Sequence, residues 1–568
     1  GATAVRFATQ SQRARPPIAD PVLLAELVSR LLVFAARFVP HEVQELEVNP
    51  LAVTPDGLVA LDVLVTLGDA PSDAAAHTPA RPVWKLPRLL EPRTIAIAGV
   101  SSGENPGRTI LRNVLRDGFD AEAVTVIKPG VEAIDGCRCV PAIDALPGKV
   151  DLFVVALAAR PAAELVAEIV ERDAAETLIL IPGGLEEKAG GEALAARMRD
   201  ALAEARGRPD GGPLVNGGNC LGVRSRPGRY DTLFIPESRL AGPGGVSAPL
   251  ALLAQSGAFA ISRLSRIEGL DPKYVVSVGN QLDLTLGDYL DYFADDPEIA
   301  VVGAYLEGFA PLDGLRFLAA ARRIADRGGV VVLYRGGRTR AGATASTSHT
   351  AAIAGDAALG AALAREAGVV VAETLDDFDD LVGTFARLAG RTIGGRRLAA
   401  LSNSGFECVA VADNLGRLEL ASFDAATADR LAEALGAAHA ADVVDIHNPV
   451  DLTPMADDAA FGEAAAAILR CATVDVAVIG NVPFTPTLRT IPLDDVGASL
   501  VVPGTIGGRL VEQWWSTTKA WVTVVDAGPR YDPLAAALSA AGIPTFRTVD
   551  RAVRALAAVV EARLGPHS

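Results

Sequence analysis

The chain has 568 residues, of which 50% are hydrophobic, and carries a formal net charge of −17. This length predicts three or four domains with their own cores, and the acidic charge argues against nucleic acid as a bulk partner. No window approaches the ~18 uninterrupted apolar residues of a membrane span. Five cysteines show neither zinc-ligand spacing nor disulfide density, so we expect free thiols in a cytoplasmic protein.

Residues 1–68 predict a helix over 21–38 and then a hairpin around the Asp-Gly of residues 51–61. Asn49 and Asp62 flank this hairpin. Their oxygens, on adjacent strands, are of the kind that Mg²⁺ takes as ligands. Asn-Pro is also common in ordinary turns, so these residues alone leave both interpretations open.

Residues 69–92 contain five prolines among alanines and predict an extended linker. Over 93–226, apolar runs alternate with helical stretches, which predicts a parallel, doubly wound sheet. A Gly-rich turn, 99–108, joins its first strand to a helix and suits a phosphate. The turn is not G-x-G-x-x-G, and Lys128 stands where NAD-binding domains place an acidic residue. Coenzyme A therefore fits better than NAD, with a purely structural Rossmann-like domain as the alternative.

Two further α/β units, over 249–390 and 396–562, open alike: an apolar strand, a Ser-Gly pair and a helix. The pairs begin at Ser256 and Ser404. Each offers a helix N-terminus whose N–H groups and positive dipole end suit a phosphate. A serine N-cap at a tight turn is the alternative explanation.

The segment from Arg338 to Asp356 surrounds His349 with small and hydroxyl residues. It has almost no apolar anchor, so it predicts a surface loop that can move. A flexible loop that carries a histidine by chance is the alternative when the segment is considered alone.

From about Glu45 onward, the chain resembles the NDP-forming acyl-CoA synthetases, the family of succinyl-CoA synthetase and the ADP-forming acetate–CoA ligases. The motifs that carry this resemblance are Glu45-Leu-Glu-Val-Asn-Pro-Leu51, Asn219-Cys-Leu-Gly222, Ser277-Val-Gly-Asn-Gln281, Tyr305-Leu-Glu-Gly308, Ser348-His-Thr-Ala-Ala-Ile-Ala-Gly-Asp356 and Asn448-Pro-Val-Asp-Leu-Thr-Pro454. The resemblance implies an α/β protein with the C-terminal part of an ATP-grasp domain (1–68), a linker (69–92), a Rossmann-like CoA-binding domain (93–226) and two flavodoxin-like ligase domains (227–392 and 393–568).

In this family, nucleotide phosphorylates a histidine on a mobile loop, the phosphate passes to a carboxylate, and the CoA thiol displaces it from the acyl phosphate. The resemblance implies that His349 is the phosphorylated nucleophile and that Glu307 orients its imidazole. It further implies phosphate binding by Ser256, Gly257, Ala258, Ser404, Gly405 and Phe406, CoA binding by Gly99, Ser101, Gly107, Arg108, Lys128, Asn219 and Cys220, and Mg²⁺ binding by Asn49 and Asp62. The chain departs from the family pattern at 406–408, where Glu407 would repel a nearby phosphate, and at Gly218, where the family has proline.

We therefore expect a cytoplasmic acyl-CoA synthetase that joins a small carboxylic acid to CoA with ATP, as a homo-oligomer or with the remaining ATP-grasp portion. The alternatives are a CoA-binding sensor that has lost catalysis and, least favoured, an NAD(P)-binding oxidoreductase. The chain begins with Gly1, and the nucleotide-binding front of the ATP-grasp domain is not in it. We thus expect His349 of this chain alone to be labelled from acyl-CoA and phosphate but not from ATP.

Overall fold

The computed structural model describes residues 19–39, 42–54, 57–68, 81–185, 188, 190–240, 242, 244, 247–267, 269–310, 313–347, 357–437, 446–495 and 497–565. They fall into two compact units, Gly1–Ala80 and Arg81–Ser568, which are described separately. Over the described part of the chain, none of the helices has the length and apolar character needed to cross a bilayer.

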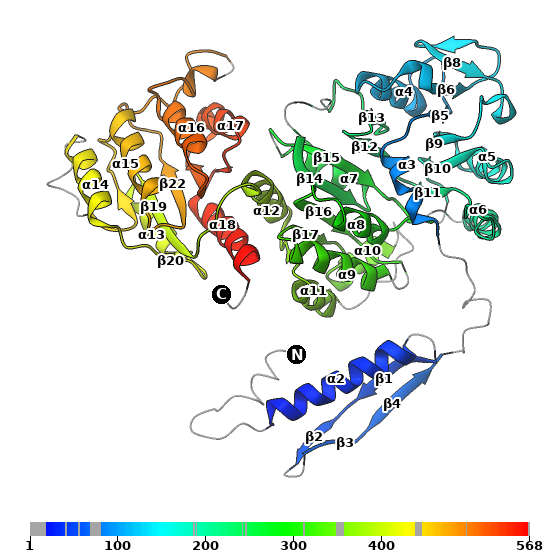
Figure 1. The fold of residues 1–568 in the computed structure, drawn as a ribbon, viewed down its shortest axis with the longest axis horizontal. Coiled ribbons are helices and arrows are strands. Elements are labelled where there is room, and N and C mark those ends of the chain that lie inside the picture. Colours follow the sequence, from blue (N-terminus) through cyan, green and yellow to red (C-terminus); the bar gives the residue numbers. More distant parts are fainter. Residues whose placement is uncertain are drawn as a thin grey trace. The chain divides into compact units, whose positions relative to one another are not determined.

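Over its described residues, the first unit contains one helix and two antiparallel strand pairs (Figure 1). Its elements are α2 (Pro21–Phe38), β1 (Val43–Val48) paired with β4 (Val63–Leu67), and β2 (Leu51–Thr54) paired with β3 (Gly57–Ala60). The predicted helix over 21–38 and the predicted hairpin are both confirmed.

The first sheet of the second unit has the strand order β11-β10-β9-β5-β6-β8-β7 and is parallel except for β7. Its strands are β5 (Ile95–Ala98), β6 (Val124–Ile127), β7 (Ala133–Ile134), β8 (Cys137–Val140), β9 (Val150–Val155), β10 (Ala175–Leu180) and β11 (Leu214–Gly217), and its helices are α4 (Pro106–Arg116), η2 (Ala121–Ala123), η3 (Ile143–Ala145), α5 (Ala159–Glu171) and α6 (Glu192–Ala205). The chain leaves β5 toward β6 and later returns to β9 on the other side. The carboxyl ends of β5 and β9 therefore form the crevice where doubly wound sheets bind ligands.

The predicted linker ends earlier than expected. Residues 69–80 lie outside the described residues, but η1 (Val83–Lys85) and α3 (Leu86–Leu90) are helical. Leu86, Leu89 and Leu90 are completely buried, and α3 packs on β9 and β10. The expectation of an extended chain is thus wrong for 83–90, because these three leucines form the apolar face of a short helix.

The second sheet has the order β13-β12-β15-β14-β16-β17-β18. Its strands are β12 (Val223–Ser225), β13 (Tyr230–Asp231), β14 (Ser247–Ala254), β15 (Asp271–Ser277), β16 (Val301–Leu306), β17 (Val330–Arg335) and β18 (Val370–Val371), and its helices are α7 (Gly257–Leu264), α8 (Leu286–Ala294), α9 (Asp313–Asp326), α10 (Arg340–Thr347), α11 (Ala357–Glu366) and α12 (Leu375–Leu388). The two faces of β14 enter different cores: Leu250 and Leu252 join the core that contains α12, and Leu253 joins the core of α8 and α9. Such continuous apolar strands are typical of a sheet that helices cover on both faces.

The third sheet is parallel, with the order β20-β19-β22-β23-β24 and with β21 also paired to β19. Its strands are β19 (Arg397–Ser402), β20 (Glu419–Leu420), β21 (Val450–Asp451), β22 (Val476–Asn481), β23 (Ala520–Val525) and β24 (Thr545–Phe546), and its helices are α13 (Gly405–Asp413), α14 (Ala425–Ala437), α15 (Asp458–Arg470), η4 (Ala498–Leu500), α16 (Ile506–Ser516), η5 (Pro529–Tyr531), α17 (Asp532–Ala540) and α18 (Val549–Leu564). The predicted α/β fold with parallel, doubly wound sheets is therefore confirmed.

Candidate active site

Glu307 directly follows β16, and Gln255 directly follows the neighbouring strand β14. The chain continues from β14 to β15 on the opposite side of β14 from β16, so the two residues stand at the switch point of this sheet. The side-chain oxygen of Gln255, which is buried, accepts hydrogen bonds from the backbone N–H of Glu307 at 2.8 Å and of Gly308 at 3.2 Å. The backbone of Glu307 is therefore held by the residue that precedes the first Ser-Gly helix.

The carboxylate of Glu307 is held separately. The hydroxyl of Tyr305 donates a hydrogen bond to its Oε1 at 2.9 Å. Burial of the phenol and the neighbouring charge of Glu307 both raise the pKa of Tyr305, so this hydroxyl remains a donor.

Helix α7 begins in the same crevice, with Ser256 as its N-cap and no acidic side chain in its first turn. The hydroxyl of Ser256 accepts from the backbone N–H of Phe259 at 3.4 Å, while Ala258 is exposed. Because the first N–H groups of a helix lack intrahelical partners, this end suits an anion. A Cβ at Gly257 would lie 2.5 Å from the Cβ of Leu221, so the close approach of the two segments requires glycine there.

Leu221 belongs to the predicted CoA motif, which thus reaches the start of α7. In this motif Asn219 takes the left-handed conformation, with φ at 51°, and the carbonyl of Gly218 accepts from the N–H of Asn280 at 2.8 Å. Cys220 is buried, and this burial raises the pKa of its thiol to about 12. The buried thiol of Cys220 donates to the carbonyl of Leu180 at 3.3 Å.

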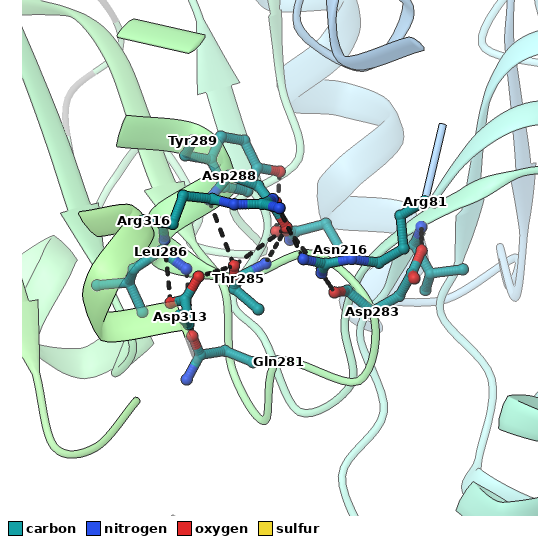
Figure 2. A network of polar contacts seen from close by, with 12 residues as sticks. Arg81, Asn216, Gln281, Asp283, Thr285, Leu286, Asp288, Tyr289, Asp313 and Arg316 are labelled. Atoms are coloured by element: carbon teal, nitrogen blue, oxygen red, sulfur yellow. Dashed lines mark hydrogen bonds and ion pairs between the residues drawn. The ribbon is translucent and has the colours of Figure 1, made fainter. Parts of the chain in front are cut away.

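A polar network joins the first two sheets (Figure 2). Arg81 and Arg316 converge on the fully buried carboxylate of Asp288, which also accepts from the backbone N–H of Thr285 at 3.0 Å. Two further side chains extend this network: Asn216 donates to the carbonyl of Ser277 at 2.9 Å and accepts from Tyr289, and Gln281 accepts from the N–H of Leu286 and donates to the carbonyl of Gly308. These contacts fix the predicted CoA segment against the strand end that carries Glu307.

The Gly-rich turn gathers most of the other predicted CoA residues at the crevice of the first sheet. Gly99 has φ at 99°, and a Cβ there would lie 2.2 Å from the carbonyl oxygen of Ala156, just beyond β9. A Cβ at Gly107 would lie 2.4 Å from the carbonyl oxygen of Gly99. The turn is closed by polar contacts: Ser101 donates to the carbonyl of Gly103, Lys128 donates to that of Val100 at 3.0 Å, and Arg108 pairs with Asp135 at 2.7 Å. Asn219 follows β11, three strands from β5, a span of roughly 14 Å along the same sheet edge.

The second Ser-Gly helix, α13, begins at the edge of the third sheet and packs against β19, β21 and α18. Phe406 is 56% exposed at its first turn, and a Cβ at Gly405 would lie 3.1 Å from the carboxylate of Asp451. Glu407 is completely buried beneath the helix and accepts from the hydroxyl of Ser402. Burial and, to a lesser extent, Asp526 raise the pKa of Glu407 to about 7, which weakens the expected charge repulsion of a phosphate.

His349 lies in 348–356, outside the described residues. Within the predicted loop over 338–356, residues 340–347 are helical as α10, so that part of the expectation is wrong. The reason is that alanines at alternate positions favour a helix despite the lack of an apolar anchor.

In the first unit, the N–H of Asn49 donates to the carbonyl of Asp62 at 3.1 Å, which places the two predicted metal ligands side by side. The Asn49 amide also donates to Glu47 at 3.0 Å, and all three side chains are exposed. Their oxygens suit Mg²⁺ in kind. Among the residues that the structure describes, no group of three His, Cys, Asp or Glu side chains is placed to hold a metal ion.

The sequence did not single out two residues at this site, Gln255 and Tyr305. Gln255 precedes Ser256, but its hydrogen bond to Glu307 depends on two strands that are about 50 residues apart in the chain. Tyr305 is two residues before Glu307 at the end of the same strand, and its hydrogen bond depends on the direction of both side chains there.

Two family models match the chain: a CoA binding domain over residues 93–226 and a succinyl-CoA ligase like flavodoxin domain over residues 247–385. The ADP-forming acetate–CoA ligase I of Archaeoglobus fulgidus is 31% identical over 83% of this chain, which spans 62% of that protein. The alpha subunit of the ADP-forming acetate–CoA ligase I of Pyrococcus furiosus is 26% identical over 84% of this chain and 97% of its own length.

Among solved structures, the dinucleotide forming acetyl-coenzyme A synthetase 1 of Candidatus Korarchaeum cryptofilum, in complex with phosphate and ADP, matches with a TM-score of 0.73. It is 26% identical, and the match covers 84% of this chain and 97% of the solved one.

Proposed function

We propose that this chain, which belongs to the NDP-forming acyl-CoA synthetase family, forms an acyl-CoA from a carboxylic acid, CoA and ATP, with release of ADP and phosphate. The observation that carries the proposal is the convergence of three segments at one crevice: Asn219–Gly222, Gln255–Ala258 and Tyr305–Gly308. They bring a CoA-binding segment, an anion-binding helix start and a carboxylate together.

In the proposed reaction, an imidazole nitrogen of His349 attacks the terminal phosphorus of ATP, so that an N–P bond forms and ADP leaves. The carboxylate of Glu307 accepts a hydrogen bond from the other ring nitrogen, which fixes the tautomer and steadies the positive charge of the ring. The substrate carboxylate then takes the phosphoryl group from His349, and the CoA thiolate attacks the acyl carbon and releases phosphate. The N–H groups at the start of α7 hold the phosphate during both transfers.

The nucleotide step belongs to an ATP-grasp portion, of which residues 1–68 form the C-terminal part, with the rest in the same polypeptide or on a partner subunit. Asn49 and Asp62 would contribute oxygen ligands to Mg²⁺, which neutralises charge on the nucleotide phosphates. The Pyrococcus relative is itself a subunit, which supports such a partner.

The reaction of acyl-CoA with phosphate can be tested on this chain separately from the nucleotide step. Acyl-CoA and phosphate should release free CoA thiol up to one equivalent per chain, because each turnover leaves one phosphoryl group on His349. A panel of acetyl-, butyryl- and benzoyl-CoA identifies the acid. Tight CoA binding with no phosphate-dependent thiol release from any thioester would instead favour the non-catalytic sensor.

A further inference from the structure

We infer that Tyr305 is a positioning residue that sets the orientation of the Glu307 carboxylate for phosphoryl transfer. This inference rests on the proposed function. The hydrogen bond from the Tyr305 hydroxyl occupies Oε1 of Glu307 at 2.9 Å. A carboxylate that must hold an imidazole in one orientation benefits when one of its oxygens is already fixed, since preorganised partners need no rearrangement during the reaction.

The ring of Tyr305 is itself fixed by aromatic contacts. It stacks on Phe259, with ring centroids 4.2 Å apart and planes 16° from parallel. Tyr334 is the residue paired with Tyr305 on the neighbouring strand β17, and the centroids of these two rings are 6.1 Å apart. A Cβ at Gly336 would lie 2.9 Å from the Tyr305 hydroxyl oxygen. The glycine at 336 leaves room for the hydroxyl, and the stacked rings hold the phenol where its hydroxyl reaches Glu307.

The same stack connects Glu307 to the phosphate-binding helix. Phe259 is the third residue of α7, and its backbone N–H donates to the N-cap Ser256. Tyr305 thus spans the distance between the helix start that would hold the phosphate and the carboxylate that would hold His349.

The test compares Tyr305→Phe with the matched control Tyr334→Phe, because both variants keep a stacked ring and only the first loses a contact to Glu307. The rate of phosphohistidine formation from acyl-CoA and phosphate should fall by about tenfold or more in Tyr305→Phe, the usual effect of losing a hydrogen bond to a charged group. The half-saturating acyl-CoA concentration should change by less than twofold, and Tyr334→Phe should stay within twofold of wild type.

The effect of Tyr305→Phe in the Glu307→Gln background distinguishes a role through Glu307 from a merely structural role of Tyr305. If Tyr305 acts through Glu307, Tyr305→Phe should cause little further loss there, and the same fold-loss in both backgrounds would overturn the inference. Gly336→Ala is a second variant, which displaces the hydroxyl without removing it and should show the same dependence on Glu307. A wild-type rate in Tyr305→Phe overturns the inference alone, whereas absence of phosphohistidine in the wild type overturns the proposed function.

Discussion

The side-chain oxygen of Gln255 accepts a hydrogen bond from the backbone N–H of Glu307 at 2.8 Å. The two residues stand at the ends of adjacent strands, and Gln255 is followed by the N-cap of α7. One side chain therefore joins the two parts of the site on which the proposed transfer depends: the helix start that suits the phosphate and the strand end that carries the carboxylate.

Gln255→Met should slow phosphohistidine formation by tenfold or more, because it leaves the N–H groups of Glu307 and Gly308 without their acceptor in a buried place. We expect a loss of stability of about 1–3 kcal/mol as well, the usual cost of such unpaired groups. Gln513→Met on α16 of the third sheet is the matched control. Single-turnover release of CoA thiol measures the rate, and equal rates in the two variants would contradict the role of Gln255.

Lys128→Ala should weaken binding of CoA more than binding of dephospho-CoA. Lys128 follows β6 and donates to the Gly-rich turn, so its charge lies at the sheet edge where the 3′-phosphate is expected. Lys149, just before β9, lies at the opposite edge in ion pairs with Asp173, Glu176 and Asp210. Calorimetric titration should show the ligand-dependent difference for Lys128→Ala and none for Lys149→Ala. An equal loss for both ligands would remove Lys128 from the phosphate site.

Glu407→Gln should change how stability depends on pH. Burial raises the pKa of Glu407 to about 7, so between its ordinary pKa and about 7 the folded protein keeps a proton that the unfolded chain releases. The stability associated with this proton is fully present at low pH and is lost as the pH rises toward 7. The variant lacks this loss, so its stability relative to wild type should increase from pH 5 to pH 8, by at most roughly 3 kcal/mol.

Thermal unfolding midpoints at the two pH values measure this effect. Glu463→Gln, which removes a 71% exposed carboxylate on α15, should follow the wild-type pH dependence. If Glu407→Gln also follows it, the carboxyl of Glu407 is charged in the folded protein at neutral pH.

The sequence predicted the sheets well because their strands are continuous apolar runs, such as β9 and β22, that alternate with amphipathic helices. Two short elements were not predicted. Strand β12 was not predicted; it lies within 93–226 but pairs with β15 of the second sheet, and three residues carry too little pattern to indicate a strand or its partner. Helix α3 was not predicted because it lies in a proline-containing segment, although Leu86, Leu89 and Leu90 have helical spacing.

At the candidate site, the motifs predict individual segments but not the contacts between them. Ser277 belongs to the motif Ser277–Gln281, but only the fold shows that its hydroxyl accepts from the N–H of Leu221 at 3.1 Å. The orientation of Glu407 was likewise not predictable, since a glutamate in the first helical turn is usually exposed and favoured by the helix dipole. Here it is buried, because its side of α13 faces Ser402 and Gly480.

In the proposed reaction, His349 carries the phosphoryl group between the acyl and nucleotide sides. The most direct measurement incubates the chain with an acyl-CoA that passes the thiol-release assay and radioactive phosphate, and locates the label by mass spectrometry. We expect acid-labile, alkali-stable label on His349 in the wild type, a rate about 10²-fold lower in Glu307→Gln, and no label in His349→Asn. Label of equal extent in His349→Asn, or on another residue, would contradict it.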